Sequence, residues 1–381
     1  MISNKRALAY GVALVVSTAF LTSTLNISLG NNVVISKDTY ELYKKYNKML
    51  GLEELVKEDF YKEVNDDELV DSAIKGMFDG LKDPYSQYYT KTEFEKLKEQ
   101  TMGSFVGIGV YLSPEEEDGL LTVISPIEGS PAQEAGLKSN DKILKVNGEV
   151  ISAKDIDKAI TMIKGKEGTE VELTIKRSSD IFDIKVKREE IVTKTIEAKN
   201  LEDKIGYIKI TSFNETTYDD FKSGIKELGD IKGLIIDVRD NPGGLLNICE
   251  DIVDDLIGEG TIVYTKDNKG NTEYLKSDKN KVDAKIAVLT NEGSASASEI
   301  LTGAIIDNKA GISVGTTTFG KGLVQSVREL KDGTGYKLTT AQYYTPSGEY
   351  INEKGINPTI EETNAEKQLQ VAVDWLKKEI N

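Results

Sequence analysis

Three serines and one lysine are the residues whose type and setting best fit catalysis. The run Gly293-Ser294-Ala295-Ser296-Ala297-Ser298-Glu299 follows a predicted buried strand and opens a predicted helix, which is where open α/β sheets tend to place their sites. Lys321 lies between two glycines in an otherwise apolar stretch. Because burial lowers the pKa of a lysine, its free amine can accept the proton of a serine hydroxyl. If the chain after Lys321 is extended, Gln325 shares its face and could orient it.

Each of these residues also has a structural interpretation. Ser296 as an N-cap, with Glu299 three residues later, would form a capping box. Lys321 could be an exposed loop lysine. Spacing alone does not choose the nucleophile among Ser294, Ser296 and Ser298, so that choice stays open at this point.

A glycine turn after another buried strand could stabilise developing negative charge. The segment Asp237-Val238-Arg239-Asp240-Asn241-Pro242-Gly243-Gly244 runs from a predicted strand into a predicted helix. Two successive glycines let backbone N–H groups approach an oxyanion at a helix start. Such Gly-Gly turns are also common structural features, so this turn alone is weak evidence of a site.

The composition excludes several other chemistries. The 381 residues contain no histidine, so there is no Ser-His-Asp triad, no Cys-His pair and no imidazole metal ligand. The one cysteine, Cys249, excludes an internal disulfide and lies in an apolar helical pattern typical of a core residue. A net charge of −16 argues against nucleic-acid binding through a broad basic face. We expect no cofactor and no metal.

The N-terminus predicts export. Lys5 and Arg6 precede an uncharged stretch that ends only at Lys37. Its strongly apolar part, residues 7–25, is long enough for one membrane-spanning helix, which needs about 20 residues. No Ala-x-Ala site follows, so we favour an uncleaved anchor, with the rest of the chain extracytoplasmic, over a cleaved signal peptide of a secreted protein. A buried core helix is the third interpretation.

The first part of the exported chain has a helical pattern. Apolar residues recur at intervals of three and four over residues 36–97, which predicts a small helical domain. Asp83-Pro84-Tyr85 interrupts the pattern, and a helix restarts with Thr92 as N-cap and Glu95 completing a capping box. We interpret the tyrosines at this break as packing residues: Tyr85, Tyr88 and Tyr89.

The middle of the chain changes to short alternating strands with glycine turns. We expect strands at 106–112, 120–124, 142–146, 170–176 and 182–187. We expect helices at 131–135 and 153–163.

From residue 204 onward strands and helices alternate in the α/β manner. The continuous apolar strands at 234–236 and 286–289 should be buried on both faces. We expect strands at 205–213, 233–238, 286–290, 312–315, 323–330 and 336–344. We expect helices at 218–228, 245–257, 298–308 and 366–378.

Together these segments resemble the carboxyl-terminal processing proteases, also called tail-specific proteases, which are Ser/Lys-dyad peptidases with a PDZ domain. The resemblance covers most of the chain and includes Asp83-Pro84-Tyr85-Ser86, the PDZ-like region, Asn241-Pro242-Gly243-Gly244, the serine run and Phe319-Gly320-Lys321-Gly322. The resemblance implies a multidomain α+β chain. Its parts would be a signal or anchor segment (1–35), a helical N-terminal domain (36–98), a PDZ domain of β-sandwich or barrel-like form (99–190) and an α/β crotonase-like (Clp-type) serine protease core (191–381).

The resemblance also implies roles for individual residues. Ser296 would be the nucleophile and Lys321 the general base. Gln325 would position the lysine. The oxyanion hole would be formed by the N–H of Ala297 and the N–H of one glycine in the Gly243-Gly244 turn.

A further glycine-rich segment resembles the carboxylate-binding loop of bacterial PDZ domains. Gly107 and Gly109 place backbone N–H groups where they can receive a free carboxylate, and Ile108 and Val110 would line an apolar pocket. The stretches 129–137 and 141–148 are similar to PDZ domains of exported proteases. A structural β-hairpin with bulge glycines is the alternative.

The sequence therefore predicts an exported or membrane-anchored serine endopeptidase. It would recognise protein or peptide substrates by their free C-termini through the PDZ domain and cleave them through an acyl-enzyme. The resemblance suggests a homodimer through the helical ends. One alternative is a PDZ scaffold protein with an inactive catalytic domain. Another is a hydratase or isomerase on the related crotonase-like fold, which the export signal and the PDZ segment argue against.

Overall fold

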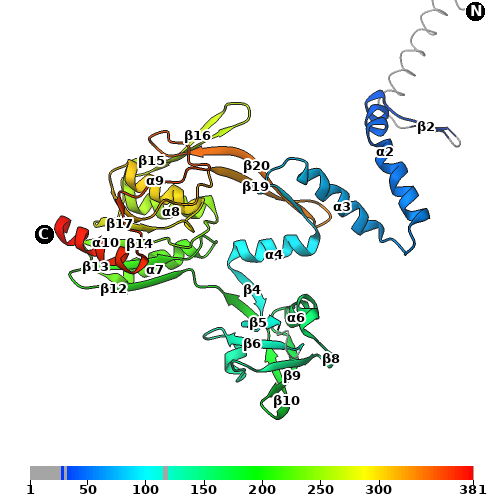
Figure 1. Cartoon of the computed structure of the whole chain (residues 1–381), viewed down its shortest axis with the longest axis horizontal. Coiled ribbons are helices and arrows are strands. Elements are labelled where there is room, and N and C mark those ends of the chain that lie inside the picture. The colour runs from blue at the N-terminus through cyan, green and yellow to red at the C-terminus, as the bar shows by residue number, and fades with distance from the viewer. Residues whose placement is uncertain (1–26, 30–31, 115–118, 381) are drawn as a thin grey trace, which may run out of the picture. The chain divides into compact units, whose positions relative to one another are not determined.

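The computed structural model of the chain describes residues 27–29, 32–114 and 119–380, in two units that divide at residue 80 (Figure 1). The predicted membrane anchor at residues 7–25, within the segment 1–35, lies outside the described residues. Within the described ranges, no helix is both long and apolar enough to cross a bilayer.

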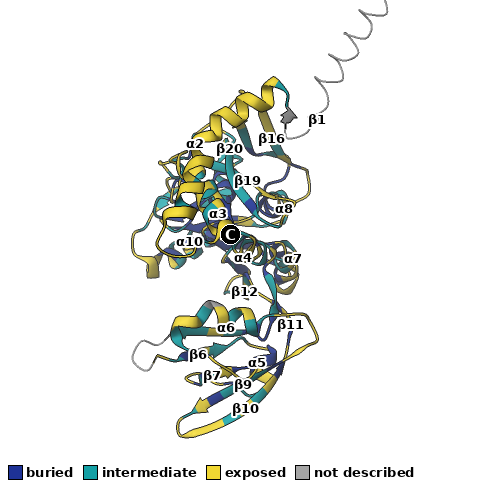
Figure 2. Ribbon diagram, turned by 90° about the vertical axis from the view of Figure 1, so that its right-hand side faces the viewer, coloured by how far each residue is buried: buried dark blue, intermediate teal, exposed yellow. Residues whose placement is uncertain are grey.

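The first unit contains a short hairpin and two helices. β1 (Ile27–Leu29) pairs antiparallel with β2 (Asn32–Val34). α2 (Lys37–Asp59) and α3 (Asp66–Asp79) follow, so the helical pattern predicted for this part is confirmed. Neither helix contains a buried residue, and α2 is exposed along its length (Figure 2). Large apolar side chains are exposed on this unit: Tyr40, Leu42, Tyr43, Tyr46, Met49, Leu50, Leu52, Leu55, Phe60, Tyr61, Val70 and Met77.

The second unit begins with a strand that joins a sheet formed much later in the sequence. β3 (Gln87–Tyr89) pairs antiparallel with β20 (Gly335–Tyr344), and α4 (Lys91–Met102) follows β3. Tyr88 and Tyr89 are buried, as predicted for packing residues.

The predicted N-cap of α4 is wrong. The capping residue is Thr90 and not Thr92, and Glu93 completes the capping box in place of Glu95. The backbone N–H of Thr90 donates to the Glu93 carboxylate at 2.8 Å. Because β3 ends at residue 89, Thr90 is the last extended residue before the helix, and the box forms there.

Residues 104–192 form the domain predicted to be a PDZ domain. Its antiparallel main sheet has the order β10-β9-β7-β6-β5, with β8 on β7. The strands are β5 (Val110–Pro114), β6 (Leu121–Pro126), β7 (Lys142–Val146), β8 (Glu149–Val150), β9 (Glu170–Arg177) and β10 (Asp180–Lys187). The helices are α5 (Pro131–Glu134), the 3-10 turn η1 (Ala153–Asp155) and α6 (Ile156–Ile163).

The predicted strand at 106–112 is interrupted. Gly109 has a φ of +73°, a left-handed conformation that breaks an extended chain. As a result, β4 (Ser104–Gly107) pairs with β11 (Glu189–Val192), whereas β5 joins the main sheet. The other strands and helices predicted for this domain agree with the structure to within a few residues.

The core of the second unit is a sheet of order β12-β13-β14-β17-β18-β21. β12 is antiparallel to β13, and the remaining pairs are parallel. The strands are β12 (Ile196–Asn200), β13 (Ile205–Ile210), β14 (Gly233–Asp237), β17 (Lys285–Thr290), β18 (Gly311–Gly315) and β21 (Ile360–Glu361).

Helices cover both faces of this sheet. Leu234 and Ile236 point into a core shared with α7 (Thr217–Leu228), α8 (Leu246–Ile257) and α9 (Ala297–Asp307). Ile235 points to the opposite face, where it packs with α10 (Ala365–Ile380). This alternation follows from the two-residue period of a strand. Burial on both faces, predicted for β14 and β17, is confirmed.

A second, antiparallel sheet of order β16-β15-β20-β19, with β3 on β20, completes the unit. β19 (Leu323–Glu329) and β20 agree with the predicted strands. β15 (Gly260–Asp267) and β16 (Thr272–Ser277) were not predicted, although β15 contains the strand-favouring run Thr261-Ile262-Val263-Tyr264-Thr265. Cys249 is fully buried in the main core, as expected.

Candidate active site

Two loops meet at the C-terminal edge of the parallel sheet. β14 and β17 are neighbours in this sheet, with Asp237 opposite Leu289. The backbone N–H of Val238 donates to the carbonyl of Leu289 at 3.1 Å. Residues 238–245 and 291–296 therefore leave the sheet side by side, so the glycine turn and the serine run start from one edge.

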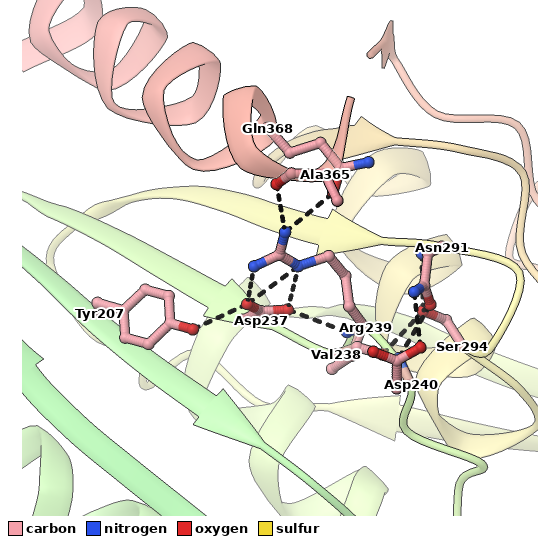
Figure 3. Close-up of polar contacts among 9 residues, drawn as sticks. All are labelled: Tyr207, Asp237, Val238, Arg239, Asp240, Asn291, Ser294, Ala365 and Gln368. Atoms are coloured by element: carbon pink, nitrogen blue, oxygen red, sulfur yellow. Dashed lines mark hydrogen bonds and ion pairs between the residues drawn. The ribbon is translucent and has the colours of Figure 1, made fainter. Parts of the chain in front are cut away.

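A buried carboxylate holds the start of the glycine loop (Figure 3). Asp237 accepts a hydrogen bond from the Tyr207 hydroxyl at 2.8 Å and forms an ion pair with Arg239 at 2.5 Å. The Arg239 guanidinium also donates to the carbonyl of Ala365 and the side-chain oxygen of Gln368, each at 3.0 Å. Because the charges of Asp237 and Arg239 are paired and hydrogen-bonded, their burial is energetically tolerable. The bonds of Arg239 to Ala365 and Gln368 also tie the loop to α10.

The glycine loop and the serine loop are also bonded directly to each other. The Asn291 side chain accepts from the backbone N–H of Asp240 at 2.9 Å and donates to the Asp240 carboxylate at 2.8 Å (Figure 3). The Ser294 hydroxyl donates to the carbonyl of Val238 at 2.8 Å. These bonds keep the two loops in fixed register.

The structure distinguishes the three serines of the run. Ser294 and Ser298 are both fully buried, and their hydroxyls donate to backbone carbonyls, those of Val238 and Asn241 respectively. Ser296 is half-buried and lines a cavity. Two of the serines therefore hold the loops together, and Ser296 is the serine that faces open space.

Ser296 has an unusual backbone conformation. Its φ and ψ are 55° and −113°, and a positive φ is sparsely populated by residues with a side chain. α9 begins at the next residue, Ala297, so the serine stands at the N-terminus of a helix. Such strain at a strand-to-helix turn projects a side chain out of the turn and is typical of functional sites.

The carboxylate of Glu299 joins the serine run to the lysine segment. It is fully buried and accepts backbone N–H bonds from Ser296 at 2.8 Å, Lys321 at 2.8 Å and Gly320 at 2.7 Å. It also accepts the Thr318 hydroxyl at 2.7 Å. Burial raises the pKa of Glu299, and these four donors oppose that rise.

Lys321 lies in a partly desolvated position. Its ammonium nitrogen is 4.7 Å from the ring centroid of Tyr85, over the face of the ring. Burial lowers the pKa of Lys321, and the positive charge of Lys337 lowers it further. The negative charges of Glu299 and Asp83 act in the opposite direction without reversing the shift. The uncharged amine form of Lys321 is therefore more favoured at this position than it would be in water.

A single cavity of about 610 Å³ brings the predicted residues of the catalytic core together. Its remaining walls come from α4, the segment 212–215, the start of α8, and strands β19 and β20. The predicted residues in its lining are Gly243, Gly244, Ser296, Ala297, Lys321 and Gln325.

The two glycines of the turn differ in what their N–H groups do. The N–H of Gly243 donates to the side-chain oxygen of Asn241 at 2.8 Å. Among the described residues, the N–H groups of Gly244 and Ala297 have no acceptor. A Cβ on Gly243 would lie 2.8 Å from the Cβ of Ser296 and 3.0 Å from the nitrogen of Ala297, so the turn and the helix start are in contact. This geometry favours Gly244 and Ala297 as donors to an oxyanion.

Gln325 lines the same cavity without bonding to the lysine. Its side-chain nitrogen donates to the carbonyl of Leu323 at 3.1 Å and to the hydroxyl of Thr339 at 3.4 Å. In the described part of the chain, no hydrogen bond joins Gln325 to Lys321. The expected positioning contact is therefore not formed here.

Comparisons with known proteins agree with this architecture. The model of peptidase family S41 matches residues 204–362, the PDZ domain model matches residues 122–177, and the model of the activating protease CtpB N-terminal domain matches residues 14–93. The carboxy-terminal processing protease CtpA of Bacillus subtilis (strain 168) is 38% identical over 354 residues, which cover 91% of this chain and 76% of the relative. The chain belongs to the carboxy-terminal processing proteases of peptidase family S41.

Other relatives of this S41 protease support the same assignment. A Staphylococcus aureus (strain MRSA252) protein named "Probable CtpA-like serine protease" is 40% identical over 321 residues, which are 82% of this chain and 64% of that protein. Among solved structures, a photosystem II D1 C-terminal processing protease matches with a TM-score of 0.52 and 26% identity, covering 88% of this chain and 90% of its own. The mixed α/β fold with an N-terminal domain, a PDZ domain and a serine-type protease core is thus confirmed.

The PDZ domain of this S41 protease holds its glycine loop tightly. A Cβ on Gly109 would lie 2.4 Å from the Cβ of Ser130, and the Ser130 hydroxyl donates to the carbonyl of Gly109 at 2.9 Å. The side chain of Ile108 is buried in the domain core, and Val110 packs partly against that core. Gly107 ends β4. The Ile108 side chain therefore does not line an open pocket, contrary to the prediction.

Three residues of the protease core that contact the site were not predicted from the sequence. Tyr343 donates its hydroxyl to the carbonyl of Lys321, and its side chain also interacts with that of Ser296. Tyr85 was interpreted as a packing residue, yet its ring lies over Lys321. Glu299 was considered only as a cap. The alternation of β20 places Tyr343 on its inner face, but no local pattern predicts contact with residues 22 to 47 positions away.

Proposed function

We propose that this S41 protease is a serine endopeptidase in which Ser296 is the nucleophile and Lys321 the general base. One observation carries the proposal: among the three serines of the run, Ser296 lines the cavity that Lys321 also lines, whereas Ser294 and Ser298 donate to buried carbonyls. The lowered pKa of Lys321 and the strained backbone of Ser296 support the same assignment.

The reaction proceeds in two halves with Lys321 as proton carrier. In acylation, the free amine takes the Ser296 hydroxyl proton while the oxygen bonds to the scissile carbonyl carbon. The resulting oxyanion lies near the N–H groups of Ala297 and Gly244. The ammonium then gives its proton to the leaving amine as the C–N bond breaks. In deacylation, water loses a proton to Lys321 and adds to the ester, and Ser296 leaves with that proton.

Tyr343 and Glu299 act on the positions of these groups. Glu299 fixes the backbones of Ser296 and Lys321, and Tyr343 bonds the Lys321 carbonyl. Gln325 is a positioning residue for the lysine only if its amide turns from Thr339 when substrate is bound.

We propose that the PDZ domain selects substrates by their free C-termini. The loop from Gly107 to Val110 offers backbone N–H groups to the carboxylate, supported by the family match of the domain and by the close contact of Gly109 with Ser130. With this role we propose the domain limits 36–98 for the helical domain, 99–190 for the PDZ domain and 191–381 for the protease core.

We propose an extracytoplasmic location, with residues 7–25 as a membrane anchor that follows Lys5 and Arg6.

We also propose that two copies of the chain associate through the helical unit. The support is the exposed apolar side chains on α2 and α3, because two helices that bury none of their residues within the described structure gain stability from a partner. Sedimentation of the chain from residue 36 onward should give a dimer, and a monomer would contradict this.

The catalytic proposal is tested by labelling with a fluorophosphonate probe, followed by peptide mapping. The modified residue should be Ser296. Ser296→Ala should abolish labelling and cleavage, whereas Ser294→Ala and Ser298→Ala should retain the labelled site at reduced stability. A label on Ser294 or Ser298 would overturn the assignment. No label on any serine, with peptide binding intact, would favour the alternative of a PDZ scaffold with an inactive core.

A further inference from the structure

The cavity lining contains more lysines than acidic residues, although the protein as a whole is acidic. The chain has a net charge of −16. The charged residues that line the cavity are nevertheless three lysines and one glutamate: Lys98, Lys321, Lys337 and Glu215. Because low-dielectric walls strengthen a local charge, a lysine in this cavity that has no acidic partner attracts anionic groups despite the opposite overall charge of the protein.

The three lysines are not equivalent. Lys98 forms ion pairs with Glu95 at 2.7 Å and with Glu329 at 3.3 Å, so its charge is balanced. Lys321 serves the proposed reaction as a free amine. Lys337 forms no ion pair with an acidic residue in the described structure, and its ammonium lies 5.9 Å from the centroid of the Tyr89 ring. Lys337 is thus the cavity lysine whose charge remains available.

The sheet holds Lys337 on the cavity side. It lies in the middle of a three-stranded ribbon, opposite Val327 of β19 and opposite Gln87 of β3. Val327 lines the cavity beside it, and Thr339, two residues further along β20, bonds the cavity residue Gln325. Residues two apart on a strand share a face, so Lys337 projects on the same side as Gln325.

We propose that Lys337 binds a carboxylate of the substrate inside the cleavage cavity, as a second anion site separate from the PDZ loop. This rests on the proposed endopeptidase function. A charge-assisted bond between an ammonium and a carboxylate is among the stronger contacts in proteins. The carboxylate comes either from the C-terminus of the substrate or from an Asp or Glu side chain near the cleaved bond.

Four matched peptides separate these sources. The first has a free C-terminus and no acidic side chain, and the second is its C-terminal amide. The third is an amide with one Glu next to the cleaved bond, and the fourth replaces that Glu by Gln. We measure kcat/KM for all four with the wild-type full chain, Lys337→Gln and Lys337→Arg. Lys98→Gln is the matched control, because it removes a cavity lysine whose charge is already paired.

Lys337→Gln should lower either the acid-to-amide ratio or the Glu-to-Gln ratio by about ten- to a hundredfold. A loss confined to the first ratio identifies the terminal carboxylate, and a loss confined to the second identifies a side chain. Lys337→Arg keeps the charge and should retain most of the preference. Lys98→Gln should leave both ratios unchanged. Any preference that comes from the PDZ loop is common to all variants and cancels when these ratios are compared.

Two results would overturn the inference. Equal slowing of all four peptides by Lys337→Gln would mean that Lys337 acts only through Lys321 or through the fold. Unchanged rates would mean that it does not act at all. Neither outcome bears on the proposed Ser296/Lys321 dyad. That proposal would be contradicted by a different result, cleavage of peptides by the Ser296→Ala variant. Circular dichroism checks the folding of each variant. Anisotropy of labelled peptides, measured on Ser296→Ala with and without Lys337→Gln, gives a binding readout that does not depend on turnover.

Discussion

The carboxylate of Glu299 accepts the backbone N–H of Lys321 at 2.8 Å, although the two residues are 22 positions apart. The same oxygen accepts the N–H of Ser296 at 2.8 Å. A single buried side chain thus sets the spacing between the backbones of the proposed nucleophile and the proposed base. This contact makes Glu299 the natural first target among the residues that do not react themselves.

Glu299→Gln should impair both folding stability and turnover. The amide keeps one acceptor oxygen, so N–H donors that now bond to the second oxygen lose their partner. Each unpaired buried donor lowers the free energy of unfolding by about 1–3 kcal/mol. Misplacement of the reacting groups should lower kcat on the order of a hundredfold. Urea unfolding and peptide kinetics measure the two effects. Glu292→Gln, an exposed carboxylate on the same loop, is the control. Wild-type kcat in Glu299→Gln would refute the positioning role.

The pH dependence of kcat/KM should report the amine of Lys321. The pKa of Lys321 is below its ordinary value of 10.5, owing first to burial and then to Lys337. Only the free amine accepts a proton, so the rate should rise with pH and level off above the lowered pKa. Lys337→Gln removes a neighbouring positive charge, which raises the pKa of Lys321 and should move the rising limb to higher pH. The charges of Glu299 and Asp83, which favour the ammonium, remain in both proteins.

Stopped assays across the range from pH 5 to the onset of unfolding, checked by circular dichroism, provide this profile. Lys266→Gln, on β15, serves as the charge-matched control. A rate that is independent of pH down to about pH 5 would contradict a lysine base, given an ordinary lysine pKa of 10.5.

Tyr85 should assist the lysine through its ring and not through its hydroxyl. The ring face attracts the ammonium that forms when Lys321 takes the serine proton, which stabilises the transition state more than the ground state. Tyr85→Leu should lower kcat by about two- to thirtyfold, whereas Tyr85→Phe should stay near wild type. Steady-state kinetics of both variants decide the matter. Equal losses in the two variants would point to the hydroxyl instead.

Gly243→Ala should inactivate the enzyme because the added Cβ would clash sterically with residues at and beside Ser296. The new Cβ would lie 2.8 Å from the Ala295 carbonyl oxygen and 2.8 Å from the Ser296 Cβ, closer than real Cβ atoms approach. Gly270→Ala is a matched control, because Gly270 also has a positive φ, 83° against 99°, but open space around its Cβ position. Labelling with the serine probe should fail in Gly243→Ala and persist in Gly270→Ala. Normal labelling of Gly243→Ala would show that the turn does not contact the reacting serine.

Gly109→Ala should weaken recognition of free C-termini by the PDZ domain. The added Cβ would lie 2.4 Å from the Ser130 Cβ, at a φ of +73°, so the loop must move. The affinity advantage of a free acid over an amide should fall by about tenfold or more. Anisotropy titrations with labelled peptides measure it. Gly129→Ala, with a similar φ of +72° and no neighbour within 4 Å, should keep the advantage. An unchanged advantage in Gly109→Ala would remove the loop from recognition.

The sequence by itself determined the features that depend on local pattern. Continuous apolar runs predicted that β14 and β17 are buried on both faces, and period-two alternation predicted most of the PDZ strands. The types of residue also narrowed the chemistry, because a chain without histidine leaves lysine, tyrosine, aspartate and glutamate for acid-base catalysis. Residue type and local pattern pointed to the segments around Gly243, Ser296 and Lys321, the resemblance to the carboxyl-terminal processing proteases implied their roles, and these segments line one cavity.

The tertiary structure alone decided the choices that depend on contacts between distant segments. Whether Ser294, Ser296 or Ser298 faces the cavity depends on which carbonyls of the neighbouring loop receive their hydroxyls. The bond of Gly243 to Asn241 likewise leaves Gly244 as the free donor. Tyr85 reaches Lys321 because β3 pairs with β20, some 250 residues later in the chain. Spacing within a short segment does not encode such pairings, since they follow from the packing of the whole unit around its buried sheets.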